Sequence, residues 1–215
     1  HRDLHLSLRR QRQMCIRDRN NVMMDELNYA LTYAKQEDAI RVVVIAANGD
    51  IFCAGADLSR SESVSNVPKI PNADDISLSL RHLYKPVICK IQGSVLAGAL
   101  LIVTNSTHAI AVKDATFSAP EIHRGLWPFM VMAGLFRVMP KRAGLDFIMR
   151  GQPIDASKAK KWGLINEHVD KTNLDKRMAT LTDRYALQFS SMEQSIAGLK
   201  ETGNYLDQMI KQDKD

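Results

Sequence analysis

The sequence predicts an α/β fold with a helical carboxyl-terminal region, and three observations support this prediction. Apolar runs typical of strands alternate with amphipathic helical segments over the first two-thirds of the 215 residues. The strand-like runs are continuous and rich in β-branched residues, as in strands that are covered on both faces. From residue 129 the pattern is mainly helical. A chain of this length can bury one sizeable core.

The bounds of the elements follow from apolar periodicity and from glycine and proline positions. Pro86 ends one expected helix and Gly151 ends another, because neither residue continues a helix well. Up to residue 118 we expect helices at about 22–37 and 74–84, strands at 41–47, 87–91, 108–112 and 115–118, and a short helix that begins near Gly98. Beyond Pro128 we expect helices at 129–139, 140–150 and 155–162, a strand at 164–169, and two helices at about 173–188 and 191–212.

The first 19 residues differ from the rest of the chain. They carry six Arg and two Asp, a net charge of +4 out of the total of +5, and show no sustained period. An organellar transit peptide would also be Arg-rich, but it would be richer in Ser and poorer in Asp. We therefore interpret residues 1–19 as a non-native or disordered leader. The remaining residues then divide into an α/β core at 20–150 and a carboxyl-terminal helical region at 151–215.

Composition excludes several classes of protein. Residues 20–215 carry a net charge of only +1, so no basic nucleic-acid-binding face is predicted. The longest apolar run, 95–103, is too short to span a bilayer, so no membrane partner is expected. The three cysteines show no C-x-x-C spacing, which favours a reducing compartment, and we expect a cytoplasmic protein. His108 and His123 lack ligand spacing, so no metal site is predicted.

Four segments resemble the crotonase superfamily, the enoyl-CoA hydratase/isomerase family, in order and spacing. They are RVVVIAANGDIFCAGADLS, KPVICKIQGSVLAGALLIV, ATFSAPEIHRGLWP and IMRGQPIDASKAKKWGLINEHV. The resemblance covers roughly residues 20 to 190. It implies a crotonase-like (ClpP/crotonase) α/β fold, a spiral of ββα units, in which the carboxyl-terminal helical region supports a homotrimer or a dimer of trimers. Relative to this family, both ends of the chain are expected to be truncated.

The resemblance also implies the chemistry of an oxyanion hole. A thioester carbonyl is polarised so that its α-carbon becomes enolate-like, and two backbone N–H groups stabilise the oxyanion. By position these donors are the N–H groups of Ala56 and Gly98, and Gly98 is expected at a helix N-terminus, where the helix dipole would help. In isolation, Gly98 could serve close helix packing and Ala56 could be a plain turn residue.

Glu121 matches the family's second catalytic glutamate, in the pattern Pro-Glu-x-x-x-Gly-Leu-x-Pro. A carboxylate between apolar segments is expected to have a raised pKa, which suits proton transfer. The other interpretation is a capping glutamate or one that is ion-paired with Arg124.

The position of the family's first glutamate is occupied by Leu101, three residues after Gly98. Leucine can neither accept a proton nor orient water, and residues 95–103 contain no ionisable group. Hydration by the two-carboxylate mechanism is therefore doubtful. Double-bond isomerisation, by a 3,2-enoyl-CoA isomerase of fatty acid metabolism, needs only one carboxylate and is the alternative to a hydratase (a lyase). A non-catalytic acyl-CoA-binding subunit is the third interpretation.

Coenzyme A enters only as the carrier of the acyl-CoA substrate, and no other cofactor is expected. The resemblance places the thioester against Ala54, Gly55, Ala56, Asp57, Leu58, Ser59 and Gly98. Asp57 is better explained as a helix cap than as a chemical group. Arg60 is either a partner of a coenzyme A phosphate or a solvated loop charge.

Overall fold

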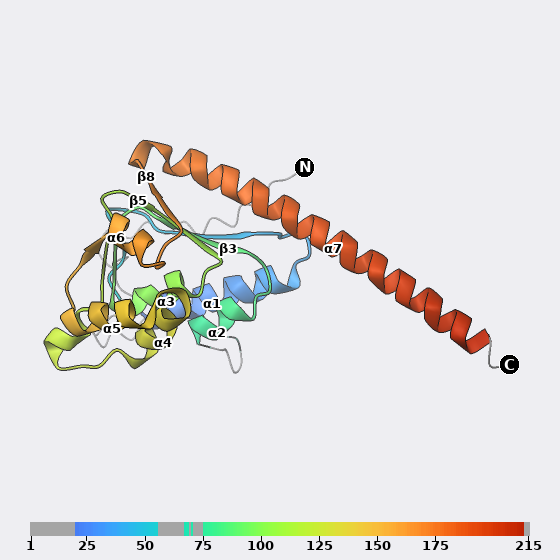
Figure 1. The fold of residues 1–215 in the computed structure, drawn as a ribbon, viewed down its shortest axis with the longest axis horizontal. Helices are drawn as coiled ribbons and strands as arrows, with labels where there is room; N and C mark the ends of the chain where they lie inside the picture. The colour runs from blue at the N-terminus through green and yellow to red at the C-terminus, as the bar shows by residue number, and fades with distance from the viewer. Residues whose placement is uncertain (1–19, 56–66, 69, 71–74, 213–215) are drawn as a thin grey trace.

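The computed structural model describes residues 20–55, 67–68, 70 and 75–212, with the strands between a layer of helices and one long helix (Figure 1). The α-helices are α1 Asn21–Gln36, α2 Ile76–Arg81, α3 Leu100–Thr104, α4 Phe129–Val138, α5 Lys141–Arg150, α6 Ala156–Lys161 and α7 Leu174–Gln212. Short 3-10 helices are η1 Ala97–Ala99, η2 Pro120–Arg124 and η3 Lys171–Asn173. The strands are β1 Val43–Ala46, β2 Ile51–Cys53, β3 Val87–Ile91, β4 Ser94–Leu96, β5 His108–Val112, β6 Thr116–Ser118, β7 Ile154–Asp155 and β8 Glu167–Val169.

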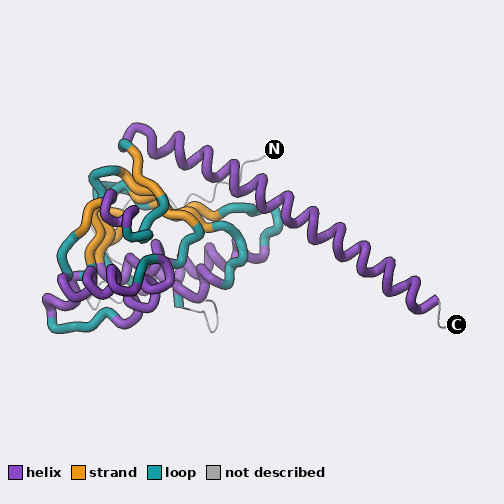
Figure 2. The backbone as a smooth tube through the Cα atoms, viewed as in Figure 1, coloured by secondary structure: helices purple, strands orange, loops and turns teal. Residues whose placement is uncertain are grey.

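Two four-stranded sheets are built from a repeated unit. One sheet has the order β1-β3-β5-β8 and is parallel throughout. The other has the order β2-β4-β6-β7, with only the β6–β7 pair antiparallel. The first three repeats each send one strand to the first sheet, the next strand to the second sheet, and then a helix to the covering layer (Figure 2). The last two strands are reversed, with β7 in the second sheet, then α6, then β8 in the first sheet. The predicted α/β spiral of ββα units is therefore confirmed.

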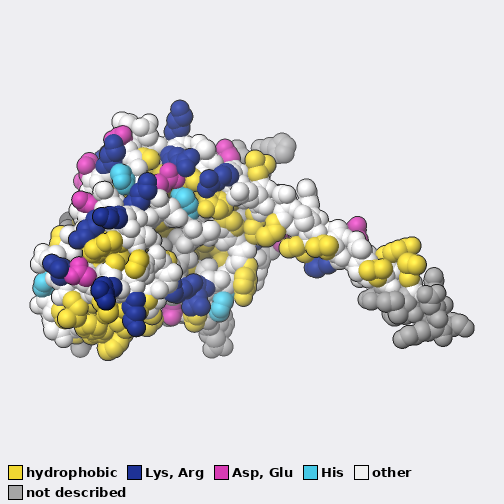
Figure 3. All heavy atoms as spheres, viewed as in Figure 1, with side chains coloured by type: hydrophobic (Ala, Val, Ile, Leu, Met, Phe, Trp, Pro, Cys, Tyr) yellow, Lys and Arg dark blue, Asp and Glu magenta, His cyan; other side chains and the backbone are white. Residues whose placement is uncertain are grey.

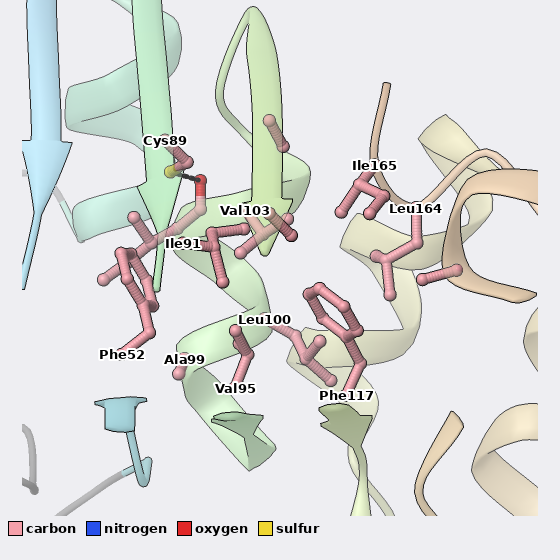
Figure 4. Packing of buried hydrophobic residues seen from close by; sticks show 14 of the residues in the cluster. Phe52, Cys89, Ile91, Val95, Ala99, Leu100, Val103, Phe117, Leu164 and Ile165 are labelled. Carbon is pink, nitrogen blue, oxygen red and sulfur yellow. Dashed lines mark hydrogen bonds between the residues drawn. The ribbon is translucent and has the colours of Figure 1, made fainter. Parts of the chain in front are cut away.

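Burial explains the composition of the central strands. All five residues of β5 and four of the five in β3 are buried, because a layer of helices covers one side (Figure 1) and α7 contacts β3 and β5. In Figure 4, Phe52, Val95, Leu100 and Phe117 point into one core between the two sheets and α3. Residues from several repeats thus share a single core, which fixes the positions of the turns between them.

Side-chain caps start several of the helices. Asn20 accepts a hydrogen bond from the Met23 N–H at the start of α1, and Asp75 does the same for the Ser77 N–H at α2. Asp155 caps α6 through the Lys158 N–H. These short polar side chains satisfy N–H groups that lack an acceptor within the helix.

The prediction of two helices at about 173–188 and 191–212 is wrong, because α7 is one helix of 39 residues. The expected break near Ser190 and Ser191 does not occur, since serine is only a weak helix breaker. The Ser195 hydroxyl donates to the Ser191 carbonyl within the helix. Arg41 and Glu193 form an ion pair that ties α7 to the body beyond that point.

Much of the outer half of α7 extends away from the sheets (Figure 1). It carries exposed apolar side chains, among them Ile196, Leu199, Tyr205 and Leu206. Figure 3 shows yellow patches along the extended part of the helix. Despite its length, α7 is not apolar enough to cross a membrane, and neither is any other helix in the part of the chain that the structure describes.

Candidate active site

The candidate site lies where three neighbouring parallel strands end. In the sheet order, β2 lies beside β4 and β4 beside β6, with Cys53 opposite Val95 and Leu96 opposite Ser118. Gly55 follows β2, η1 with Gly98 follows β4, and η2 with Glu121 follows β6. Neighbouring strands lie about 4.8 Å apart, so the three turns meet at one edge of the sheet. Carboxyl ends of parallel strands are where α/β folds place their ligands.

The two glycine turns approach each other so closely that Gly55 has no room for a side chain. A methyl group added at Gly55 would lie 2.9 Å from the Ala97 Cβ and 3.7 Å from the Gly98 nitrogen. Gly55 also has a φ of +99°, a conformation that L-residues rarely adopt. The Gly98 nitrogen therefore lies close to the turn at residue 55.

Ala97 was not identified from the sequence as a special position. Its φ is +53°, in the left-handed region, and it introduces the 3-10 helix that holds Gly98. Alanine gives no sequence signal for a positive φ, whereas glycine would have done so.

The helix at Gly98 is short, as the sequence predicts. The 3-10 turn η1 covers three residues and α3 covers five. The expected helix N-terminus is present, but a helix dipole from so few residues contributes little. The N–H groups at the start of a helix have no acceptor inside it, so any stabilisation by Gly98 would come from its own hydrogen bond.

Glu121 is the half-buried carboxylate of the site. Its Oε2 atom is buried and has no hydrogen-bond partner in the described part of the chain. Burial raises the pKa of Glu121, although its own backbone N–H and the charge of Arg124 act in the opposite direction. A carboxyl group with a raised pKa and an oxygen without a partner is suited to move a proton.

The interpretation of Glu121 as a structural ion pair is not supported. The charge of Arg124 acts to lower the pKa of Glu121, but no ion pair joins these two described residues. The Glu121 carbonyl accepts from the Leu126 N–H, which shapes the turn through Gly125, whose φ is +68°. The backbone of Glu121 is therefore structural, and its side chain remains available.

Leu101 is a packing residue. It is buried in α3, and its Cδ2 atom would lie 3.7 Å from a methyl group added at Gly134 of α4. The same methyl group would lie 2.4 Å from the Thr104 Oγ1 atom. Gly134 thus allows α3 and α4 to pack closely, and an apolar side chain at position 101 fits that contact. The role of Gly134 was missed because a lone glycine in a helix has many explanations.

The structure brings together part of the predicted site. Ala54, Gly55, Gly98 and Glu121 lie on the edge described above, with Gly55 buried. The other predicted contacts, Ala56, Asp57, Leu58 and Ser59, lie outside the described residues, as does Arg60. Among the described residues, no three His, Cys, Asp or Glu side chains gather as metal ligands.

An exposed apolar surface borders the turn that carries Glu121. Leu126, Phe129 and Met130 are each more than half exposed, and the Trp127 and Phe129 rings meet edge-on with centroids 6.4 Å apart. The sequence predicts an apolar helix at 129–139. Periodicity alone could not show that its first residues face solvent.

Comparisons with known proteins agree with this geometry. The family model described as "Enoyl-CoA hydratase/isomerase" matches residues 15–208. The chain is 30% identical to mevalonyl-coenzyme A hydratase of Aspergillus fumigatus, covering 69% of this chain and 57% of that protein. It is 23% identical to mouse mitochondrial enoyl-CoA hydratase domain-containing protein 3, covering 85% of this chain and 61% of that protein. The chain therefore spans about 60% of the length of these curated relatives.

Solved structures show the same similarity. An enoyl-CoA hydratase from Mycobacterium smegmatis is 27% identical and superposes with a TM-score of 0.68, covering 76% of this chain and 65% of that one. An enoyl-CoA hydratase/isomerase family protein from Silicibacter pomeroyi is 28% identical with a TM-score of 0.66, covering 77% of this chain and 71% of that one.

Proposed function

The chain belongs to the enoyl-CoA hydratase/isomerase family, and from this premise we propose that it acts on an acyl-CoA thioester through an enolate. The observation that carries the proposal is the convergence of Gly55, Gly98 and Glu121 at the ends of three adjacent strands. The Gly98 N–H, together with that of Ala56, would bind the thioester oxygen. Glu121 would move a proton at the carbon beside the carbonyl.

Isomerisation of a 3-enoyl-CoA to a 2-enoyl-CoA is the reaction that this set of groups fits best. The Glu121 carboxylate would take a proton from C2, which breaks the C2–H bond and forms a dienolate with its charge on the thioester oxygen. Glu121 would then return the proton to C4, and the double bond would move from C3–C4 to C2–C3. The raised pKa of Glu121 supports both proton transfers.

Hydration of a 2-enoyl-CoA is the second candidate and follows the names of the relatives. It would need a group to hold and activate water, and the buried Leu101 cannot do this. Because Leu101 packs close to Gly134 of α4, a glutamate at position 101 would put a charge into an apolar contact. We therefore rank isomerisation above hydration, and catalysis above a purely acyl-CoA-binding role.

The test compares two thioesters on one preparation of the full chain. We expect 3-hexenoyl-CoA to be isomerised faster than crotonyl-CoA is hydrated, and Glu121→Gln to lower the isomerisation rate by about 10²–10⁴. Leu101→Glu supplies a second carboxylate but puts a charge into the α3–α4 contact, so its folding is checked by urea unfolding; the folded variant is expected to gain hydration of crotonyl-CoA. If the chain binds acyl-CoA tightly but is inactive with both thioesters, it is a non-catalytic acyl-CoA-binding subunit instead.

We further propose that the protein works in the cytoplasm, in fatty acid metabolism, as a homotrimer or a dimer of trimers. The exposed apolar side chains of α7, with Leu187 and Leu199 each more than 70% exposed, support burial against another copy. Light scattering on the purified chain gives the mass that checks the assembly, and a monomer at micromolar concentration would contradict it.

A further inference from the structure

A groove of about 600 Å³ opens at the opposite end of the strands from the candidate active site. Its lining includes Pro86, just before β3, and Thr107, just before β5, so it lies at the amino ends of these strands. Gly98 lies beyond the other end, because β4 follows β3 after two residues and η1 follows β4. The volume is within the range of about 300–1,000 Å³ that is usual for small-molecule sites.

The charge of the groove is of one sign. Arg81, Lys85 and Arg137 line it, and no Asp or Glu side chain does so among the described residues. Lys85 donates to the Ala34 and Glu37 carbonyl oxygens, at 2.7 and 2.8 Å. These acceptors are neutral, but the Asp38 and Glu37 carboxylates offset part of the Lys85 charge, so the charge available to a ligand comes mainly from Arg81 and Arg137.

Arg137 and Arg81 keep donors for a ligand. Arg137 gives one guanidinium nitrogen to the Asn105 side-chain oxygen at 3.0 Å, again a neutral acceptor, and a guanidinium has further N–H groups. Arg81 is exposed and forms no ion pair with a described carboxylate. A bidentate carboxylate is the partner for which an arginine fork is shaped.

The negative end of α3 also faces the groove, but its carbonyls are already satisfied. The Leu101 carbonyl accepts from the Asn105 side-chain amide at 2.8 Å, and the Ile102 carbonyl accepts from the Ser106 hydroxyl at 2.7 Å. These bonds, and the short length of α3, weaken the repulsion that the helix end would exert on an anion.

The walls of the groove are apolar and aromatic. Phe189 and Met192 come from α7, and Leu80 comes from α2. Tyr84 stands at the edge, 75% exposed, with a φ of +56°. A left-handed conformation is unfavourable for a bulky aromatic residue, and such strain is often found at functional positions.

We propose that this groove binds a small amphipathic carboxylate, a site separate from the proposed acyl-CoA site. The apolar part of the ligand lies against Phe189, Met192 and Tyr84, and its carboxylate lies between Arg81 and Arg137. Cationic groups over an apolar wall select this ligand over a neutral or cationic one of the same shape.

The experiment titrates octanoate into the full chain by calorimetry, with octanol as the neutral probe. We expect saturable octanoate binding at least five-fold tighter than octanol binding, and unchanged when the active site is filled with coenzyme A. Arg81→Ala is expected to weaken octanoate binding about five-fold. The matched control Arg142→Ala, which removes an exposed arginine of α5 outside the groove, is expected to leave it unchanged.

Tyr84→Gly provides a second variant, because glycine accepts the positive φ. It removes the aromatic wall together with the ring contacts to His82 and Lys35, so urea unfolding checks that the variant is folded, and it is expected to weaken octanoate binding. The proposal is overturned by any of four results: no saturable binding, equal binding of octanol, displacement by coenzyme A, or equal effects of Arg81→Ala and Arg142→Ala. A change in oligomer mass in the groove variants, with no octanoate binding, would instead identify an interface between copies and also overturn it.

Discussion

Replacing Gly55 with alanine adds one methyl group where the two glycine turns of the site meet. At a φ of +99° the substitution strains the backbone, by about 1–2 kcal/mol for a left-handed alanine. The methyl group would also lie 2.9 Å from the Ala97 Cβ and 3.2 Å from the Leu96 carbonyl oxygen, and such overpacking costs about 1–3 kcal/mol. The expected loss in unfolding free energy is the sum, about 2–5 kcal/mol.

Gly49→Ala is the matched control for the backbone strain. Gly49 has a φ of +86°, close to that of Gly55, but a methyl group there would meet nothing within 4 Å. We expect Gly49→Ala to cost only about 1–2 kcal/mol. Ala97→Gly in the Gly55→Ala background removes the atom that the new methyl group would strike. The double variant is therefore expected to recover about 1 kcal/mol or more beyond additivity.

The assays are urea unfolding and 3-enoyl-CoA isomerisation on Gly55→Ala, Gly49→Ala, Ala97→Gly and the double variant. Displacement of the Gly98 N–H is expected to lower the rate of Gly55→Ala by up to about 10²–10³, the usual effect of losing one oxyanion donor. Gly49→Ala is expected to keep the wild-type rate. Close contact between the two turns would be refuted if Gly55→Ala lost no more stability than Gly49→Ala, or if Ala97→Gly gave no rescue.

Three further predictions concern the packing and charges of the site and the sheet. Burial raises the pKa of Glu121, so ionisation of this group lowers the free energy of unfolding as pH rises through that pKa. In urea unfolding, Glu121→Gln should therefore be more stable than wild type at pH 7. Below about pH 4 it should be no more stable than wild type. In Gly134→Ala the added methyl group would lie 2.4 Å from the Thr104 Oγ1 atom, and the free energy of unfolding should fall by about 1–3 kcal/mol. Thr104→Ala in the same chain should recover part of this loss. Equal melting temperatures of Gly134→Ala and wild type would contradict the prediction. Burial lowers the pKa of His108 below 6.5, although the Glu167 carboxylate lies 3.1 Å from its Nε2. The unfolded chain therefore takes up the proton first, and the free energy of unfolding falls as pH drops below about 6.5. His108→Gln should reduce this fall between pH 7 and about pH 5.5 in urea unfolding.

Local sequence patterns were sufficient to predict much of the fold. The predicted strands 87–91 and 108–112 match β3 and β5 residue for residue, because both are short β-branched or apolar runs with clear ends. The glycine turn at Gly55 and the helix that ends at Gly151 were likewise visible, since positive φ angles favour glycine.

Features that depend on tertiary contacts could not be predicted in the same way. The positive φ of Ala97 and the close packing at Gly134 arise from the approach of neighbouring elements, and neither feature can be predicted from the residue type alone. The continuity of α7 was missed because the amphipathic pattern was divided at about residues 189–190, while the ion pair from Arg41 to Glu193 joins residues far apart in the chain. The groove was invisible for the same reason, because its walls come from five separate segments.

The central claim is that the turn at Gly98 and the Glu121 carboxylate together form and protonate a thioester enolate. Exchange of the C2 protons of butyryl-CoA in D₂O, followed by NMR, measures this step without hydration or isomerisation. The account predicts exchange by the wild-type chain, loss of exchange in Glu121→Gln, and retention of exchange in Gly49→Ala. Exchange that persists in Glu121→Gln at the wild-type rate would contradict it.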